Sequence, residues 1–183
     1  MAVEANSETK QKKGRKMNPM TQFQKISVLL VLSLLSLGTG TVLATPPSGV
    51  TTETVGAATF EEMDVHMKTA PWKVNLDTKG SSDLNIVKNT VVPGGTFGWH
   101  THPGPCFVMV LSGAATKYEG DDPTCTPEVI PAGGTFVDNP GPLGHLVRNE
   151  GAIDLVVVIT RLVPQGALIR IDVPNPGYCP EIN

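Results

Sequence analysis

Short apolar runs alternate with turn-forming residues along most of this chain, and this pattern predicts an all-β fold. The runs are separated by glycine- and proline-rich segments such as residues 93–95 and 139–142. Many short strands with this punctuation are typical of a β-sandwich or barrel. No segment after Thr45 has the periodicity of a long amphipathic helix. The expected strands are Ala57–Met63, Trp72–Leu76, Leu84–Val92, Phe107–Leu111, Ala114–Tyr118, Glu128–Ile130, Thr135–Val137, Gly144–Arg148, Leu155–Leu162 and Ala167–Val173.

The first 44 residues differ from the rest of the chain. A basic stretch precedes an apolar run, Ile26 to Leu37, and small residues then lead to Ala44. This order is typical of a secretory signal peptide, so we expect a helical signal segment that is cleaved after Ala44. The alternative is an uncleaved membrane anchor, because residues 26–44 are long enough to span a bilayer. The first reading predicts export to the periplasm or the extracellular space.

Three further segments are expected after this signal. Residues 45–57 lack apolar periodicity and indicate a linker or an extended arm. Residues 58–173 hold the expected strands and form the predicted domain. Residues 174–183 are expected to form a C-terminal tail.

Charge changes at the same boundary. The chain has 14 Lys and Arg and 17 Asp and Glu, and residues 1–44 hold six of the basic residues but only two of the acidic ones. The remaining part is therefore acidic, which argues against nucleic acid and anionic membrane surfaces as partners. The 19 Gly and 16 Pro agree with a turn-rich β domain.

The three cysteines fit an oxidising compartment. Cys125 and Cys179 both lie in segments rich in proline, which indicates surface loops. We expect a disulfide between them that fastens the C-terminal tail to the domain, with two unpaired loop thiols as the alternative. Cys106 is then left over.

Three of the four histidines form one pattern. His100 and His102 project from the same face if their segment is extended, because side chains alternate along a strand. His145 follows 43 residues after His102. Neutral imidazole is a common ligand of transition metals, so these three residues are candidate metal ligands. His66 lies outside the pattern and is expected at the surface or at a strand edge.

The first half of this pattern resembles a motif of the cupin superfamily. That motif has glycine, five residues, His-x-His, three or four residues, glutamate, six residues and glycine. Here Gly94, His100, His102 and Gly113 occupy the matching positions, with Cys106 at the glutamate position. The local sequence is similar to exported bacterial single-domain cupins of the type-2 kind.

The second cupin motif is matched further along the chain. Gly134 is followed after five residues by Pro140, then by His145 and, three residues later, Asn149. Pro142 stands where the motif has glycine. The resemblance implies a double-stranded β-helix, or jelly roll, in which the two motifs face each other and their histidines converge inside the barrel. It also implies one divalent transition metal, with iron, zinc, copper, nickel and manganese all open.

Cys106 is the most informative departure from the family pattern. As a fourth ligand, a thiolate would favour zinc, iron or copper over manganese. The alternative is that Cys106 is a small buried hydrophobic residue. Thiol dioxygenases are cupins with a cysteine at this motif position, where it is cross-linked to a tyrosine. The two tyrosines of this chain are Tyr118 and Tyr178.

The motifs leave several functions open. The motif glutamate is replaced by Cys106, and we expect no other carboxylate of the motif cores beside the metal, which argues against acid–base chemistry. An oxygenase-type or other metal-dependent enzyme acting on a small molecule in the barrel is the first hypothesis. A non-catalytic module that binds a metal or a small ligand is the second, and a structural role is the third. A homodimer is the expected candidate assembly.

Overall fold

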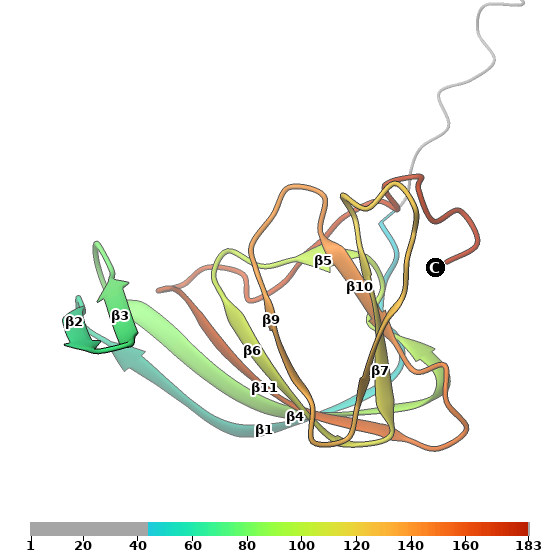
Figure 1. Cartoon of the computed structure of the whole chain (residues 1–183), viewed down its shortest axis with the longest axis horizontal. Helices are drawn as coiled ribbons and strands as arrows, with labels where there is room; N and C mark the ends of the chain where they lie inside the picture. Colours follow the sequence, from blue (N-terminus) through green and yellow to red (C-terminus); the bar gives the residue numbers. More distant parts are fainter. Residues whose placement is uncertain (1–43, 183) are drawn as a thin grey trace, which may run out of the picture. The chain divides into compact units, whose positions relative to one another are not determined.

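The computed structural model describes residues 44–182, which form strands and no helix (Figure 1). The signal segment predicted over residues 1–44 lies, except for Ala44, outside the described residues. No helix within the described range is long and apolar enough to span a membrane. The strands are β1 (Ser48–Phe60), β2 (Asp64–Thr69), β3 (Trp72–Asp77), β4 (Ser82–Thr96), β5 (His100–Thr101), β6 (Cys106–Ser112), β7 (Ala114–Glu119), β8 (Glu128–Pro131), β9 (Thr135–Asp138), β10 (His145–Arg148), β11 (Leu155–Pro164) and β12 (Ile171–Asp172).

Ten of these strands form one sheet that curls into a nearly closed barrel (Figure 1). The order is β12-β5-β10-β4-β11-β6-β9, with β1 also paired to β4, and with β7 paired to β10 and β8. The predicted all-β barrel is confirmed. Its centre is the long antiparallel pairing of β4 with β11, which runs from Leu155 opposite Val91 to Pro164 opposite Ser82.

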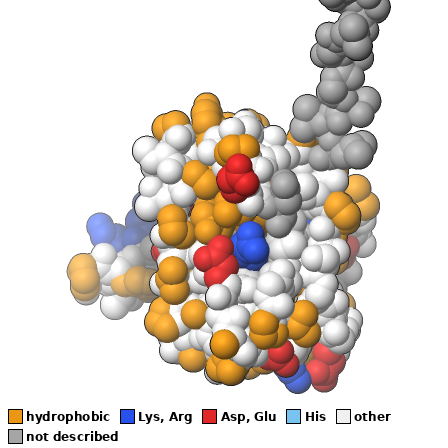
Figure 2. Space-filling model, turned by 90° about the vertical axis from the view of Figure 1, so that its right-hand side faces the viewer, with side chains coloured by type: hydrophobic (Ala, Val, Ile, Leu, Met, Phe, Trp, Pro, Cys, Tyr) orange, Lys and Arg blue, Asp and Glu red, His pale blue; other side chains and the backbone are white. Residues whose placement is uncertain are grey.

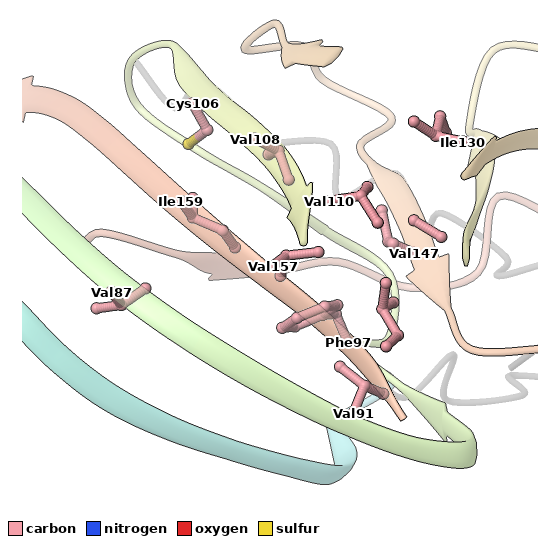
Figure 3. Packing of buried hydrophobic residues seen from close by; sticks show 12 residues of the cluster. Val87, Val91, Phe97, Cys106, Val108, Val110, Ile130, Val147, Val157 and Ile159 are labelled. Atoms are coloured by element: carbon pink, nitrogen blue, oxygen red, sulfur yellow. The ribbon is translucent and has the colours of Figure 1, made fainter. Parts of the chain in front are cut away.

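Alternating side chains of β4, β6 and β11 fill the interior of the barrel (Figure 3). Val157 and Ile159 of β11 are buried, and Val108 of β6 packs against the same cluster. Burying one such side chain contributes roughly 1.5–3 kcal/mol, so this cluster is a main source of stability. Arg161 occupies the next inward position of β11 after Ile159, and it is the charged member of that row.

A second cluster lies where the C-terminal tail covers the barrel wall. It contains Trp99, Tyr118, Leu146 and Cys179. The Trp99 indole N–H donates to the carbonyl oxygen of Ile182 at 3.1 Å. Trp99 is fully buried. The tail is also fastened covalently, because Cys125 and Cys179, the pair predicted from sequence, are joined by a disulfide.

The segment predicted as a linker or arm contributes most of β1. This strand pairs with β4 from Thr51 opposite Thr90 to Phe60 opposite Ser82, with one register shift between Thr54 and Gly56. Most of its side chains are exposed, so backbone pairing holds it in place more than apolar burial does. The hairpin of β2 and β3 extends beyond the far ends of β1 and β4 (Figure 1). On the face shown in Figure 2, charged side chains are interspersed with apolar and neutral ones.

Removing the disulfide is expected to destabilise the protein without changing its fold. The bridge links residues 54 positions apart, and loop-closure entropy then contributes at most about 4 kcal/mol. We expect the double variant Cys125→Ala, Cys179→Ala to lower the free energy of unfolding by up to this amount in urea denaturation. Thiol titration of the wild-type protein should find one free cysteine. Three free thiols, or an unchanged free energy of unfolding, would contradict the prediction.

Candidate metal centre

Strand pairing brings the three candidate histidines together. His100 begins β5, and His145 begins β10 directly opposite it in the antiparallel register. His102 lies one residue beyond the end of β5. The ring centroid of His100 lies 4.9 Å from that of His102 and 4.4 Å from that of His145. One nitrogen from each ring can be chosen so that all three lie within 4.8 Å of one another.

The hydrogen bonds of these rings fit a metal site. The Nδ1 atom of His100 lies 2.8 Å from the carbonyl oxygen of Gly98, and that of His102 lies 2.7 Å from the carbonyl oxygen of Ile169. A carbonyl only accepts, so each Nδ1 carries the hydrogen and each Nε2 keeps a free lone pair. Metal-binding histidines are commonly oriented in this way. The three buried histidines are therefore positioned to hold a metal.

A glycine allows the strands to approach closely enough for this geometry. Gly144 precedes His145 and has a φ of +68°, which non-glycine residues rarely adopt. A Cβ at this position would lie 2.5 Å from the carbonyl oxygen of His100. Any side chain here would push β5 and β10 apart at the point where their histidines meet.

Burial keeps two of the imidazoles neutral. Burial lowers the pKa of His100 well below its ordinary value, and the neighbouring His145 lowers it further. Burial is also the main cause that lowers the pKa of His102 to about 4. Both rings are therefore unprotonated at neutral pH, which is the form that binds a metal.

A carboxylate lies beside this cluster, which corrects the expectation of a site without one. Asp138, at the end of β9, is only 5% exposed, and its Oδ2 lies 3.2 Å from Nε2 of His145. The two atoms are not aligned for a hydrogen bond, so this Nε2 has no hydrogen-bond partner among the described residues. Asp138 falls within the five-residue spacer of the second motif, before Pro140. Asp138 lies two residues after the partly buried Phe136 on the same strand, so side-chain alternation predicts that both point into the barrel.

Cys106 lies outside the group of three histidines. It starts β6, is fully buried, and stands opposite Asp138 in the pairing of β6 with β9. Figure 3 shows it in the apolar cluster with Val108. Burial raises the pKa of its thiol to about 12, which keeps it protonated. These features fit a buried neutral residue better than a thiolate ligand.

The other residues named from the sequence, the two tyrosines and His66, lie away from the three clustered histidines. The Tyr118 hydroxyl donates to Glu150 at 2.8 Å, and this tyrosine packs in the cluster around Trp99 instead of the one that contains Cys106. Tyr178 is exposed. His66, on β2, is exposed as expected, and its Nε2 lies 2.6 Å from Asp64 Oδ1.

A cavity of about 380 Å³ opens beside the histidines inside the barrel. His100 and His102 line one part of it, and most of the rest is apolar. Two cationic side chains, Arg161 and Arg170, also line it, and sequence reasoning did not single out either of them. The alternation of β11 was the available signal for Arg161, because this residue continues the inward row of Val157 and Ile159.

The buried imidazoles predict that the metal-free protein loses stability in acid. The unfolded chain protonates His102 near its ordinary pKa of 6.5, whereas the folded protein does so near 4, so the unfolded state binds more protons between these values. This contribution is complete above pH 6.5 and is lost as the pH falls to 4, with a size of up to about 3 kcal/mol.

Urea unfolding between pH 4 and 7.5 measures this effect. His102→Gln should flatten the pH dependence of the free energy of unfolding, and the same substitution at the exposed His66 is the matched control. An identical slope in wild type and His102→Gln would show that this ring does not titrate as its burial indicates.

Cys106→Ala is expected to leave metal binding intact. The thiol is neutral and lies outside the histidine cluster, so its removal takes no ligand away. Elemental analysis should find the same metal content in the variant and the wild type. A thiolate-to-metal absorption band in cobalt-loaded wild type that disappears in the variant would assign Cys106 as a ligand after all.

Comparison with solved structures finds 266 matching chains. An uncharacterised conserved protein with a double-stranded β-helix domain from Klebsiella pneumoniae is 23% identical, with 49% of this chain and 74% of that chain covered and a TM-score of 0.41. A cupin-2 domain protein from Rhodospirillum rubrum is 15% identical, with 68% and 70% covered and a TM-score of 0.44. A predicted oxalate decarboxylase from Thermotoga maritima is 19% identical, with 47% and 84% covered and a TM-score of 0.37.

A search of curated proteins found no match to this chain. The family model described as "Cupin domain" matches residues 88–160. This range contains β5, β6 and β10 and all three histidines of the cluster. The match shows a cupin domain over residues 88–160, in agreement with the two motifs.

Proposed function

We propose that this cupin binds one divalent transition metal through His100, His102 and His145 and acts on a small molecule held in the barrel cavity. The observation that carries the proposal is the convergence of three buried imidazoles, with ligand atoms within 4.8 Å of one another, beside that cavity. Three histidine ligands leave further coordination positions open, which is typical of catalytic rather than structural metal sites.

A metal bound here would supply Lewis-acid polarisation of a substrate oxygen or activation of bound water or oxygen. The chain itself positions the imidazoles and keeps the cavity largely free of water. The carbonyl oxygens of Gly98 and Ile169 orient two of the imidazoles, and the apolar walls exclude water. Asp138 adds a buried carboxylate that can hold a proton next to His145.

This carboxylate favours a metal-dependent enzyme, of oxygenase type or another type, as the first function. A non-catalytic module that captures a small ligand is the second. The mostly apolar lining of the cavity supports it, because such walls bind an organic molecule without any chemical step.

We also propose that the protein works outside the cytoplasm. Disulfides persist mainly in oxidising compartments, and the described part of the chain contains one between Cys125 and Cys179. Its presence is consistent with the export signal predicted over residues 1–44.

Metal content tests the proposed function. The protein purified from its native compartment should carry about one divalent transition metal per chain in elemental analysis. His145→Ala should weaken metal affinity at least tenfold, because one of the three ligands is lost while the fold is retained. His66→Ala is the matched control, since it removes an exposed histidine outside the cluster.

Two results would contradict the proposal. One is a wild-type protein that contains no metal and takes up none after incubation with iron, manganese, cobalt, nickel, copper and zinc salts. The other is a His145→Ala variant that binds metal as tightly as the wild type.

A further inference from the structure

Arg161 is a buried cation in the interior of the barrel. It lies on β11, opposite Asn85 of β4 and Cys106 of β6, and only 9% of it is exposed. The inward positions on either side of it in β11 are occupied by Ile159 and Val163, both buried. An arginine therefore takes a place where the strand otherwise puts aliphatic side chains.

The guanidinium group has no carboxylate partner within 4.0 Å in residues 44–182. Its Nη1 donates to Asn85 Oδ1 at 3.2 Å, and its Nε makes no hydrogen bond within the described part of the chain. The thiol of Cys106 beside it is neutral. By contrast, Arg170, the other arginine of the cavity, is paired with Asp172 at 2.5 Å and donates to the carbonyl oxygen of Phe97.

Packing alone does not account for this arginine. An unpaired buried charge is strongly destabilising, and apolar residues of similar volume often replace buried ions without loss of stability. Arginine remains protonated even where burial lowers its pKa, as it does here. The position therefore holds a permanent positive charge that no described carboxylate contacts within 4.0 Å, although Asp138 attracts it from further away.

Unsatisfied polar atoms concentrate in the same cavity. Among the described residues, five buried side-chain atoms lack a hydrogen-bond partner, and three of them belong to cavity-lining residues: Asn89, Asp138 and Arg161. Most of the remaining lining is apolar, with Val108, Phe136 and others facing the space. Of these three atoms, Arg161 Nε is a donor that can receive an anionic group, whereas Asn89 Oδ1 and Asp138 Oδ1 are acceptors. A ligand that satisfies Arg161 and fits these walls has an anionic end and an apolar body.

We propose that Arg161 binds the carboxylate of a small organic acid whose apolar body fills the barrel cavity beside the three histidines. A guanidinium group can donate two parallel hydrogen bonds to one carboxylate, whereas an ammonium group acts as a point charge. The volume of about 380 Å³ holds an acid of the size of a phenyl-substituted short-chain carboxylate. The inference rests on the proposed function, whose substrate class it names.

Calorimetric titration of the purified full chain tests this inference with two matched probes. 3-Phenylpropanoate carries the carboxylate, and 3-phenylpropanamide has the same shape without the charge. We expect the wild type to bind the acid at least tenfold more tightly than the amide. Arg161→Met should weaken binding of the acid by about 10- to 100-fold and leave that of the amide unchanged. Arg161→Lys should give an intermediate affinity, because it keeps the charge but loses the fork.

Arg148→Met is the matched control, since Arg148 does not line the cavity and lies beside Glu150. It should bind both probes as the wild type does. If Arg161→Met does not fold, as judged by thermal unfolding, Arg161→Lys and the acid–amide comparison on the wild type decide. Equal binding of acid and amide by the wild type, no binding of the acid at millimolar concentration, or an unchanged affinity in a folded Arg161 variant would overturn the proposal.

Metal content separates this inference from the proposed function. Arg161→Met should keep the wild-type metal content, because Arg161 is not among the clustered ligands. A metal-free wild type that still prefers the acid through Arg161 would refute the metal function alone. A metal-loaded protein that does not distinguish acid from amide would refute this inference alone.

Discussion

The contact between β5 and β10 is the constraint on which the centre depends. The antiparallel register puts His145 opposite His100, and the missing side chain of Gly144 lets the two backbones approach. Main-chain pairing therefore fixes the positions of two histidines of the cluster. His102 joins them through the bond of its Nδ1 to the Ile169 carbonyl. A site held in this way is preorganised, so little conformational entropy is lost when a ligand binds.

Burial has opposite consequences for the groups inside this barrel. It keeps His100 and His102 neutral, which prepares them to donate electron pairs. It keeps the thiol of Cys106 protonated and unreactive. It leaves Arg161 charged, at a cost to stability, because a guanidinium does not lose its proton. The interior of the barrel thus holds two neutral imidazoles, a protonated thiol and a permanent cation.

Sequence patterns predicted the barrel strands well where apolar residues alternate, as in Leu155–Leu162, which became the core of β11. They did not predict β2, whose residues are exposed on both faces. They also assigned most of β1 to a linker or arm, because a strand held mainly by backbone pairing has few apolar side chains to reveal it. The three histidines could be predicted because the two cupin motifs place them at fixed spacings in the sequence. Strand alternation places Asp138 and Arg161 inward, but it does not show that both reach the cavity, because that depends on the pairing of distant strands.

The C-terminal tail has a closer relation to the metal centre than its position in sequence suggests. Trp99 and His100 are neighbours on one short stretch of backbone, and they face opposite sides of the barrel wall. The tail covers Trp99 through the Ile182 carbonyl and is anchored there by Cys179. The tail therefore contacts a residue that is joined to His100 by a single peptide bond. Residues 174–182 thus cover the outer side of the wall that carries the histidine cluster.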